Sequence, residues 1–187
     1  MKMQYYQIQP DPRVKSVSKV YESDYDKRVA AENRGEVYLG PFIADDLGRD
    51  EITEHDWIPS VGCKLVTDRF VSAVRCYDMR QPEFFEVTIT WGPENLLEWV
   101  GDVIAAYYTV KLPQVEVIDA EKTPLHFWPT LKKFKMLDYV ITRPMPDDVH
   151  IGIDQRQPGV VLCTEDFKSW AERDRLMVGF TPVPCAI

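Results

Sequence analysis

The residues best suited to chemistry in this chain are carboxylates that stand next to one another. General acid–base catalysis needs two acids held at a set separation in different environments. Adjacent acids in a loop are explained by solvation, and acids in the first turn of a helix complement its dipole. We therefore expect no catalytic residue among these pairs: Asp45-Asp46, Asp147-Asp148 and Glu165-Asp166.

The histidines and cysteines lack the spacing that is typical of metal or cofactor sites. The chain has no HExxH, CxxC, GxSxG or GxxxxGK[ST] motif, and no GxGxxG follows a predicted strand. An isolated histidine is more often structural than a metal ligand, and a free cysteine packs as a small hydrophobe. We predict no cofactor and no metal at these residues: His55, His126, His150, Cys63, Cys76, Cys163 and Cys185.

The densest negative segment of the chain is residues 44–57, ADDLGRDEITEHDW. The segment contains six acids and one base, Arg49, and its lack of periodicity predicts an exposed loop or a short frayed helix. Trp57 ends the segment, and Trp128 lies in a proline-flanked stretch further along the chain. An exposed tryptophan is a good interface anchor, whereas a buried one belongs to the core, and the sequence leaves both alternatives open for these two residues.

The overall composition predicts a folded, acidic and soluble protein. Its 187 residues suit one large domain or two small lobes, and 45% hydrophobic residues suffice for a packed core. The first residues do not resemble a secretory signal, and no apolar run reaches the roughly 18 residues of a membrane span. We expect a cytoplasmic protein whose net charge of −8 disfavours nucleic acid and anionic membranes and favours basic partners.

One phrase occurs twice in the chain. LVTDRFVS begins at Leu65, and LCTEDFKS begins at Leu162, 97 positions later. In each copy a threonine precedes an acid, which is the pattern of an N-cap followed by a charge that complements the helix dipole. A phenylalanine then starts an apolar helical stripe, and strand-like runs flank each helix. The repetition predicts two related strand–helix–strand units, not two active sites.

The pattern of the remaining chain favours strands. Residues 5–9, 83–91 and 137–142 are strand-like, and turn residues separate them from their neighbours. We predict an α+β fold with a mixed, largely antiparallel sheet, two strand–helix–strand units and few helices. Residues 1–56 are expected to add strands and the acidic loop to the same globular unit, and residues 57–187 to form the α+β domain.

Three segments resemble a family of bacterial immunity proteins from polymorphic-toxin systems, the family of the eleventh immunity-protein domain. The first is KLVTDRFVSAVR followed by FFEVTI, and the second is the tyrosine-rich YYTVKLPQVEVIDAEKT. The third and most specific is GVVLCTEDFKSWAERDRLMVGFTPVP, a strand, a capped helix and a closing Gly-Phe-x-Pro-Val. The resemblance covers residues 57–184, and residues 1–56 carry little of it.

The resemblance implies an antitoxin without catalysis of its own, which protects a bacterium by covering the active site of a cognate secreted toxin. A basic toxin, such as a nuclease, would suit the negative charge of the chain. Two interpretations from other classes remain open: an enzyme or effector with an unrecognised active site, and a ligand-binding or structural module that uses the loop around Trp128. We expect the toxin contact at the acidic segment and its tryptophan: Asp45, Asp46, Asp50, Glu51, Glu54, Asp56 and Trp57.

Overall fold

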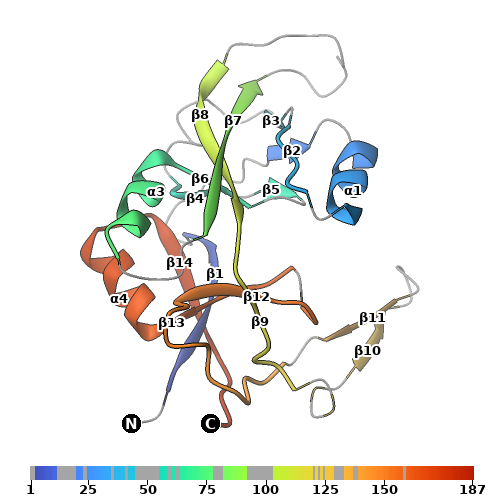
Figure 1. Cartoon of the computed structure of the whole chain (residues 1–187), viewed down its shortest axis with the longest axis vertical. Coiled ribbons are helices and arrows are strands. Elements are labelled where there is room, and N and C mark those ends of the chain that lie inside the picture. Colours follow the sequence, from blue (N-terminus) through green and yellow to red (C-terminus); the bar gives the residue numbers. More distant parts are fainter. Residues whose placement is uncertain are drawn as a thin grey trace.

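The structure is a computed structural model with an α+β fold (Figure 1). It describes residues 3–11, 20–22, 25–34, 36–40, 42–44, 55–58, 60–61, 64–77, 82–91, 103–119, 121, 123, 125–128, 133–136, 139–157 and 159–187. Within these residues the strands form a seven-stranded sheet, a five-stranded sheet and a two-stranded ribbon, and most neighbouring strands are antiparallel. This confirms the predicted fold class.

The seven-stranded sheet has the order β4-β6-β8-β7-β3-β2-β5. Its longest pair is β7 against β8, two antiparallel strands whose register shifts once, between Ile89 and Thr90. The helix α1 (Tyr25–Asn33) follows β2 in the chain. The strands, in chain order, are β2 (Val20–Glu22), β3 (Phe42–Ala44), β4 (Trp57–Ile58), β5 (Ser60–Val61), β6 (Leu65–Val66), β7 (Glu83–Trp91) and β8 (Val103–Lys111).

The five-stranded sheet has the order β14-β1-β13-β12-β9. Its parallel pair, β12 with β9, leaves little room for a side chain at Gly152, because a Cβ there would lie 3.1 Å from the carbonyl oxygen of Pro113. The separate ribbon consists of β10 (Leu125–Trp128) and β11 (Lys133–Met136). The strands of the sheet are β1 (Tyr5–Pro10), β9 (Gln114–Val115), β12 (Ile151–Asp154), β13 (Val161–Thr164) and β14 (Val178–Val183).

The repeated phrase forms two helices with the same start. Thr67 caps α3 (Asp68–Arg75), and Thr164 caps α4 (Glu165–Arg173). Each threonine hydroxyl accepts a hydrogen bond from the backbone N–H three residues later, at 3.3 Å in both cases. The backbone at the two caps is also nearly identical, with φ of −81° and −79° and ψ of 165° in both. The predicted caps are therefore confirmed.

The two copies extend beyond the helices to whole four-stranded units. The first unit is β4-β6-β8-β7 with α3, and the second is β12-β13-β1-β14 with α4. In each unit the strands before and after the helix are both antiparallel to the strand that lies between them, so they are parallel to each other. The middle strand of the first unit, β8, comes after β7 in the chain, whereas that of the second unit, β1, comes from the other end of the chain.

Equivalent side chains make equivalent contacts in the two units. Tyr108 on β8 pairs with Val66, and its hydroxyl lies 3.4 Å from the Asp68 carboxylate at the start of α3. Tyr6 on β1 pairs with Cys163, and its hydroxyl donates to the Glu165 carboxylate at the start of α4. The tyrosine-rich runs at residues 5–6 and 107–108 thus occupy the same place in the two units.

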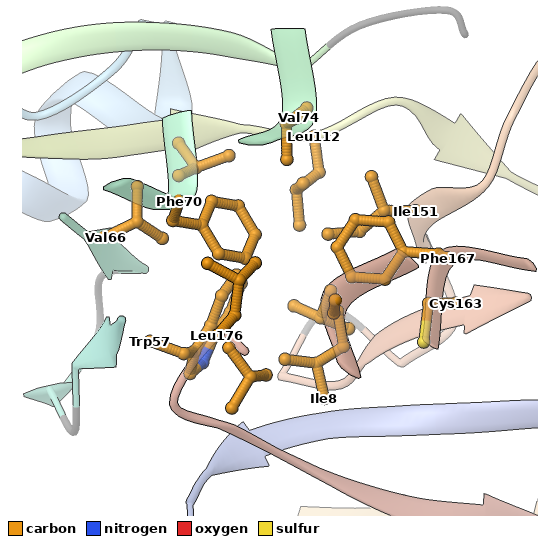
Figure 2. Close-up of a cluster of buried hydrophobic side chains, with 14 of the residues drawn as sticks. Ile8, Trp57, Val66, Phe70, Val74, Leu112, Ile151, Cys163, Phe167 and Leu176 are labelled. Atoms are coloured by element: carbon orange, nitrogen blue, oxygen red, sulfur yellow. The ribbon is translucent and has the colours of Figure 1, made fainter. Parts of the chain in front are cut away.

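The units pack through a shared apolar core (Figure 2). Phe70 from α3 and Phe167 from α4 point toward one another, with ring centroids 6.1 Å apart. Strand residues face this core alternately: Val66 and Cys163 belong to it, whereas their neighbours Leu65 and Leu162 belong to clusters on the opposite faces of their sheets. Each sheet is therefore covered on both faces.

The strands predicted at residues 5–9 and 83–91 are confirmed as β1 and β7. The strand predicted at residues 137–142 is wrong over residues 139–142, where only Ile141 makes isolated bridges, to Ile118 and Cys185, and residues 137–138 lie outside the described residues. The ribbon of β10 and β11 was not predicted, since prolines flank its first strand.

The buried Tyr107 should make the stability of the protein depend on pH in the alkaline range. Its side chain is buried, and its hydroxyl has no hydrogen-bond partner among the described residues. Burial raises its pKa to about 12, so above pH 10 the unfolded tyrosine loses its proton first and the free energy of unfolding falls, by up to about 1.4 kcal/mol per pH unit until pH 12. Tyr107→Phe should stabilise the protein by about 1 kcal/mol at pH 7 and lessen its loss of stability at high pH.

Urea unfolding at pH 7, 9 and 11 measures this effect. Tyr139→Phe is a matched control, because the pKa of Tyr139 is also raised to about 12 by burial, but its hydroxyl donates to Gln7 at 3.1 Å. The control should lose stability at pH 7 and lose less of it between pH 9 and 11. A Tyr107→Phe variant that is destabilised at pH 7 would contradict the prediction.

Candidate functional site

A cavity of about 330 Å³ lies beside the start of α4. It is bordered by β1, by the turn that precedes β12, and by the first turn of α4. Its walls combine apolar side chains with carboxylates from two separate segments of the chain. The lining residues are Met3, Gln4, Tyr5, Met145, Pro146, Asp147, Val149, His150, Thr164, Glu165 and Asp166.

His150 is attached to the cap of α4. Its Nδ1 lies 3.1 Å from the Thr164 hydroxyl, and its backbone carbonyl accepts from the Thr164 N–H at 3.0 Å. The imidazole also meets the Trp170 ring edge-on, at 4.7 Å between centroids. These contacts from both sides hold the ring at the wall of the cavity.

Trp170 belongs to a stack of rings that joins the two helices. Tyr77, just after α3, lies parallel to Trp170 at 4.1 Å between centroids. The Tyr77 hydroxyl donates to Asp174 at 2.7 Å and accepts from Arg173 at 2.8 Å. Burial, followed by the hydrogen bond to Asp174, raises the pKa of Tyr77. The stack therefore links the wall of the cavity to the first unit.

The acids around the cavity differ in their partners. Glu165 accepts from Tyr6, which raises the pKa of the tyrosine, and lies 3.4 Å from the Lys168 ammonium. Asp166, also in the first turn of α4, is exposed. Asp147 is exposed in the turn closed by the Val149 N–H, which donates to the Pro146 carbonyl at 2.9 Å. The cavity thus has an apolar floor and a negatively charged rim.

The first unit carries a corresponding position at Asp56. Like His150 in the second unit, Asp56 accepts the cap N–H of its unit through its backbone carbonyl, here from Thr67 at 3.3 Å. The Thr67 hydroxyl donates to its carboxylate at 2.5 Å, and the Met177 N–H donates at 2.8 Å. The Arg69 guanidinium lies 3.7 Å away. Asp56 is therefore a link between the first unit and the connection from α4 to β14.

The structure corrects two residues of the predicted toxin contact. Asp56 is 4% exposed and Trp57 is 6% exposed, so neither is a surface group. Trp57 packs in the shared core, with its ring centroid 5.7 Å from that of Phe70. The cause is β4, which starts at Trp57 and pairs with β6, so that Trp57 and the preceding Asp56 enter the interior. The rest of the predicted contact lies outside the described residues: Asp45, Asp46, Asp50, Glu51 and Glu54.

The cysteines and the histidine at position 55 differ in their burial. Cys163 is buried in the shared core, as predicted, and burial raises the pKa of its thiol well above the usual value. His55 is buried, and Cys76 is exposed. In the part of the chain that the structure describes, no group of three His, Cys, Asp or Glu side chains could hold a metal ion. None of its helices is long and apolar enough to cross a membrane.

The cavity as a unit is not predictable from the spacing of its residues. Its lining residues Asp147, Glu165, Asp166 and His150 were singled out separately, as members of acid pairs and as an isolated histidine. Nothing in their spacing joins them to residues 3–5, because β1 reaches this place only by pairing with β13. The matching tyrosine pairs at residues 5–6 and 107–108 were the available signal that β1 belongs to the second unit.

Asp56→Ala should lower the free energy of unfolding by about 2–4 kcal/mol, because it leaves the Met177 N–H and the Thr67 hydroxyl without their buried acceptor. Urea unfolding measures the change, with Asp148→Ala as the control, since Asp148 is exposed. A loss below about 0.5 kcal/mol would place Asp56 among ordinary surface positions and contradict its role as a link.

The chain matches no protein-family model and no curated protein.

Proposed function

We propose that the protein is an immunity protein, which binds a cognate bacterial toxin and neutralises it by covering the toxin's active site. The proposal rests on the three segments that resemble the immunity family. Those segments coincide with β6–α3–β7, with β8 and β9, and with β13–α4–β14. This coincidence carries the proposal, because it makes the resembling residues the framework of two packed units and not scattered matches.

The charge of the chain supports a basic toxin as the partner. The net charge of −8 attracts a positive surface from a distance, and carboxylates gather around the cavity beside α4. Tight binding by occlusion is favoured by a rigid surface, because a preorganised domain loses little conformational entropy when it binds. The shared core and the ring stack between the helices supply that rigidity.

Co-expression tests the function. A toxin gene adjacent to the gene of this protein is expressed in a susceptible bacterium, with and without this protein, and surviving cells are counted. We expect killing by the toxin alone and survival when both are made. Phe167→Ala is the control for protein abundance: this variant should unfold at lower temperature, so less folded protein is present and protection should be weaker. Killing in both cases, with the protein present in soluble form, would overturn the proposal.

The acidic segment remains a predicted contact within this function. Changing Asp45, Asp46, Asp50 and Glu51 to lysine should slow association with a basic toxin about tenfold or more at low salt, because long-range steering is lost. The difference should shrink as salt rises. Stopped-flow association rates measure it, and the same rate in wild type and variant at low salt would remove this segment from the interface.

A further inference from the structure

We infer that the cavity beside the Thr164 cap receives an arginine or lysine side chain of the protein partner. The inference rests on the proposed function and names one subsite of its interface. The two units differ at their corresponding cap positions. In the first unit a side chain of this chain, Arg69, lies at the cap, whereas in the second unit the cap borders a cavity.

The first unit shows what its cap position binds. There the Asp56 carboxylate faces the Arg69 guanidinium at 3.7 Å and accepts the Met177 N–H at 2.8 Å. The same guanidinium donates to the Asp174 carbonyl at 3.3 Å and to the Arg175 carbonyl. The connection that follows α4 therefore lies against this cap, and a positive side chain lies between its carbonyls and the carboxylate.

The second unit carries different residues at the two matching places, and one of them changes the sign of the charge. His150 stands where the first unit has Asp56, and Asp166, the second residue of α4, stands where α3 has Arg69. The chain thus places a carboxylate where the first unit has its own cation. A cavity of about 330 Å³ opens here, with Asp147, Glu165 and Asp166 in its wall.

The remaining walls suit the stem of a long cationic side chain. Met3, Met145 and Val149 supply apolar surface, and lysine and arginine bury their methylene groups on such surface while the charged head stays at a polar rim. The rim offers carboxylates to that head, and a guanidinium forms charge-assisted hydrogen bonds with them. Complementary charge and an apolar floor together select a cationic side chain over a neutral or acidic one.

The site can be tested on the full chain without the toxin. The probe is the peptide acetyl-Gly-Arg-Gly-amide, and its uncharged control is the same peptide with citrulline. Protein labelled with ¹³C at its methionine methyl groups reports binding by NMR, because Met3 and Met145 line the cavity whereas Met177 does not. We expect saturable shifts of Met3 and Met145 with the arginine peptide, none with citrulline, and no shift of Met177.

The matched variants are Asp147→Asn with Asp166→Asn, and Asp148→Asn as the control beside the cavity. The double variant should bind the peptide about fivefold more weakly, and the control should bind as the wild type does. No saturable shift up to about 20 mM peptide, equal shifts with citrulline, or an unchanged double variant would overturn the inference.

Affinity for the purified toxin then separates the two proposals. No complex with the wild-type chain would overturn the proposed function, and the peptide experiment would still decide the chemistry of the cavity. A toxin complex of equal affinity with the wild type and the Asp147→Asn, Asp166→Asn variant would overturn the subsite alone. A weaker complex with that variant, but not with Asp148→Asn, would support both.

Discussion

Phe167→Ala should lower the free energy of unfolding by about 3–5 kcal/mol, the usual cost of removing a buried aromatic ring and leaving a cavity. Phe167 is 2% exposed, and its ring meets Phe70 at 6.1 Å and Phe180 at 6.5 Å between centroids. It therefore contacts both the other unit and its own sheet. Thermal and urea unfolding measure the loss, and Leu39→Ala, at an exposed position, should change stability by less than about 0.5 kcal/mol.

A double-mutant cycle with Phe70 tests the junction between the units. Because the two rings touch, the costs of Phe70→Ala and Phe167→Ala should not add, and their coupling should exceed about 0.5 kcal/mol. Additive costs would mean that each helix is held by its own unit alone. A destabilisation of this size should also reduce protection in cells, because less folded protein is present.

Asp154→Ala should cost about 3–5 kcal/mol, because a fully buried carboxylate here holds three backbone N–H groups. Its Oδ2 accepts from Val117 at 2.8 Å and from Ile118 at 2.9 Å, and its Oδ1 accepts from the Arg156 N–H at 2.9 Å. The Arg156 guanidinium adds an ion pair at 3.6 Å. These contacts attach the segment after β9 to the end of β12.

Asp154→Asn separates charge from shape. The amide keeps the size of the side chain but offers one acceptor oxygen, so the expected cost is smaller, about 2 kcal/mol. Asp147→Asn, at an exposed acid, is the control and should be nearly neutral. Urea unfolding with an unchanged dependence on denaturant would assign the loss to stability; equal stability of wild type and Asp154→Ala would contradict the role of this carboxylate.

Local patterns were enough to predict the elements of the repeated phrase. Thr67 and Thr164 cap their helices because a threonine oxygen satisfies an N–H that the helix leaves open, and this interaction spans only three residues. The alternation of β7 predicted its strand for a similarly local reason. The predicted strand at residues 137–142 failed, because composition cannot say whether a neighbouring strand will be present to pair with it.

The sequence by itself determined the α+β class, the two capped helices and the existence of two related units, since each depends on spacing within a few residues. Only the tertiary structure decided that β1 completes the second unit, because strand pairing joins residues from opposite ends of the chain. It also decided that Trp57 is buried, because that side chain packs in the core that the two units share. The pairing of β1 brings residues 3–5 to the first turn of α4 and forms the cavity. Composition predicted a contact surface at the acidic segment 44–57. Packing places the last two residues of that segment, Asp56 and Trp57, in the interior. Packing also brings other acids together around the cavity, at Asp147, Glu165 and Asp166.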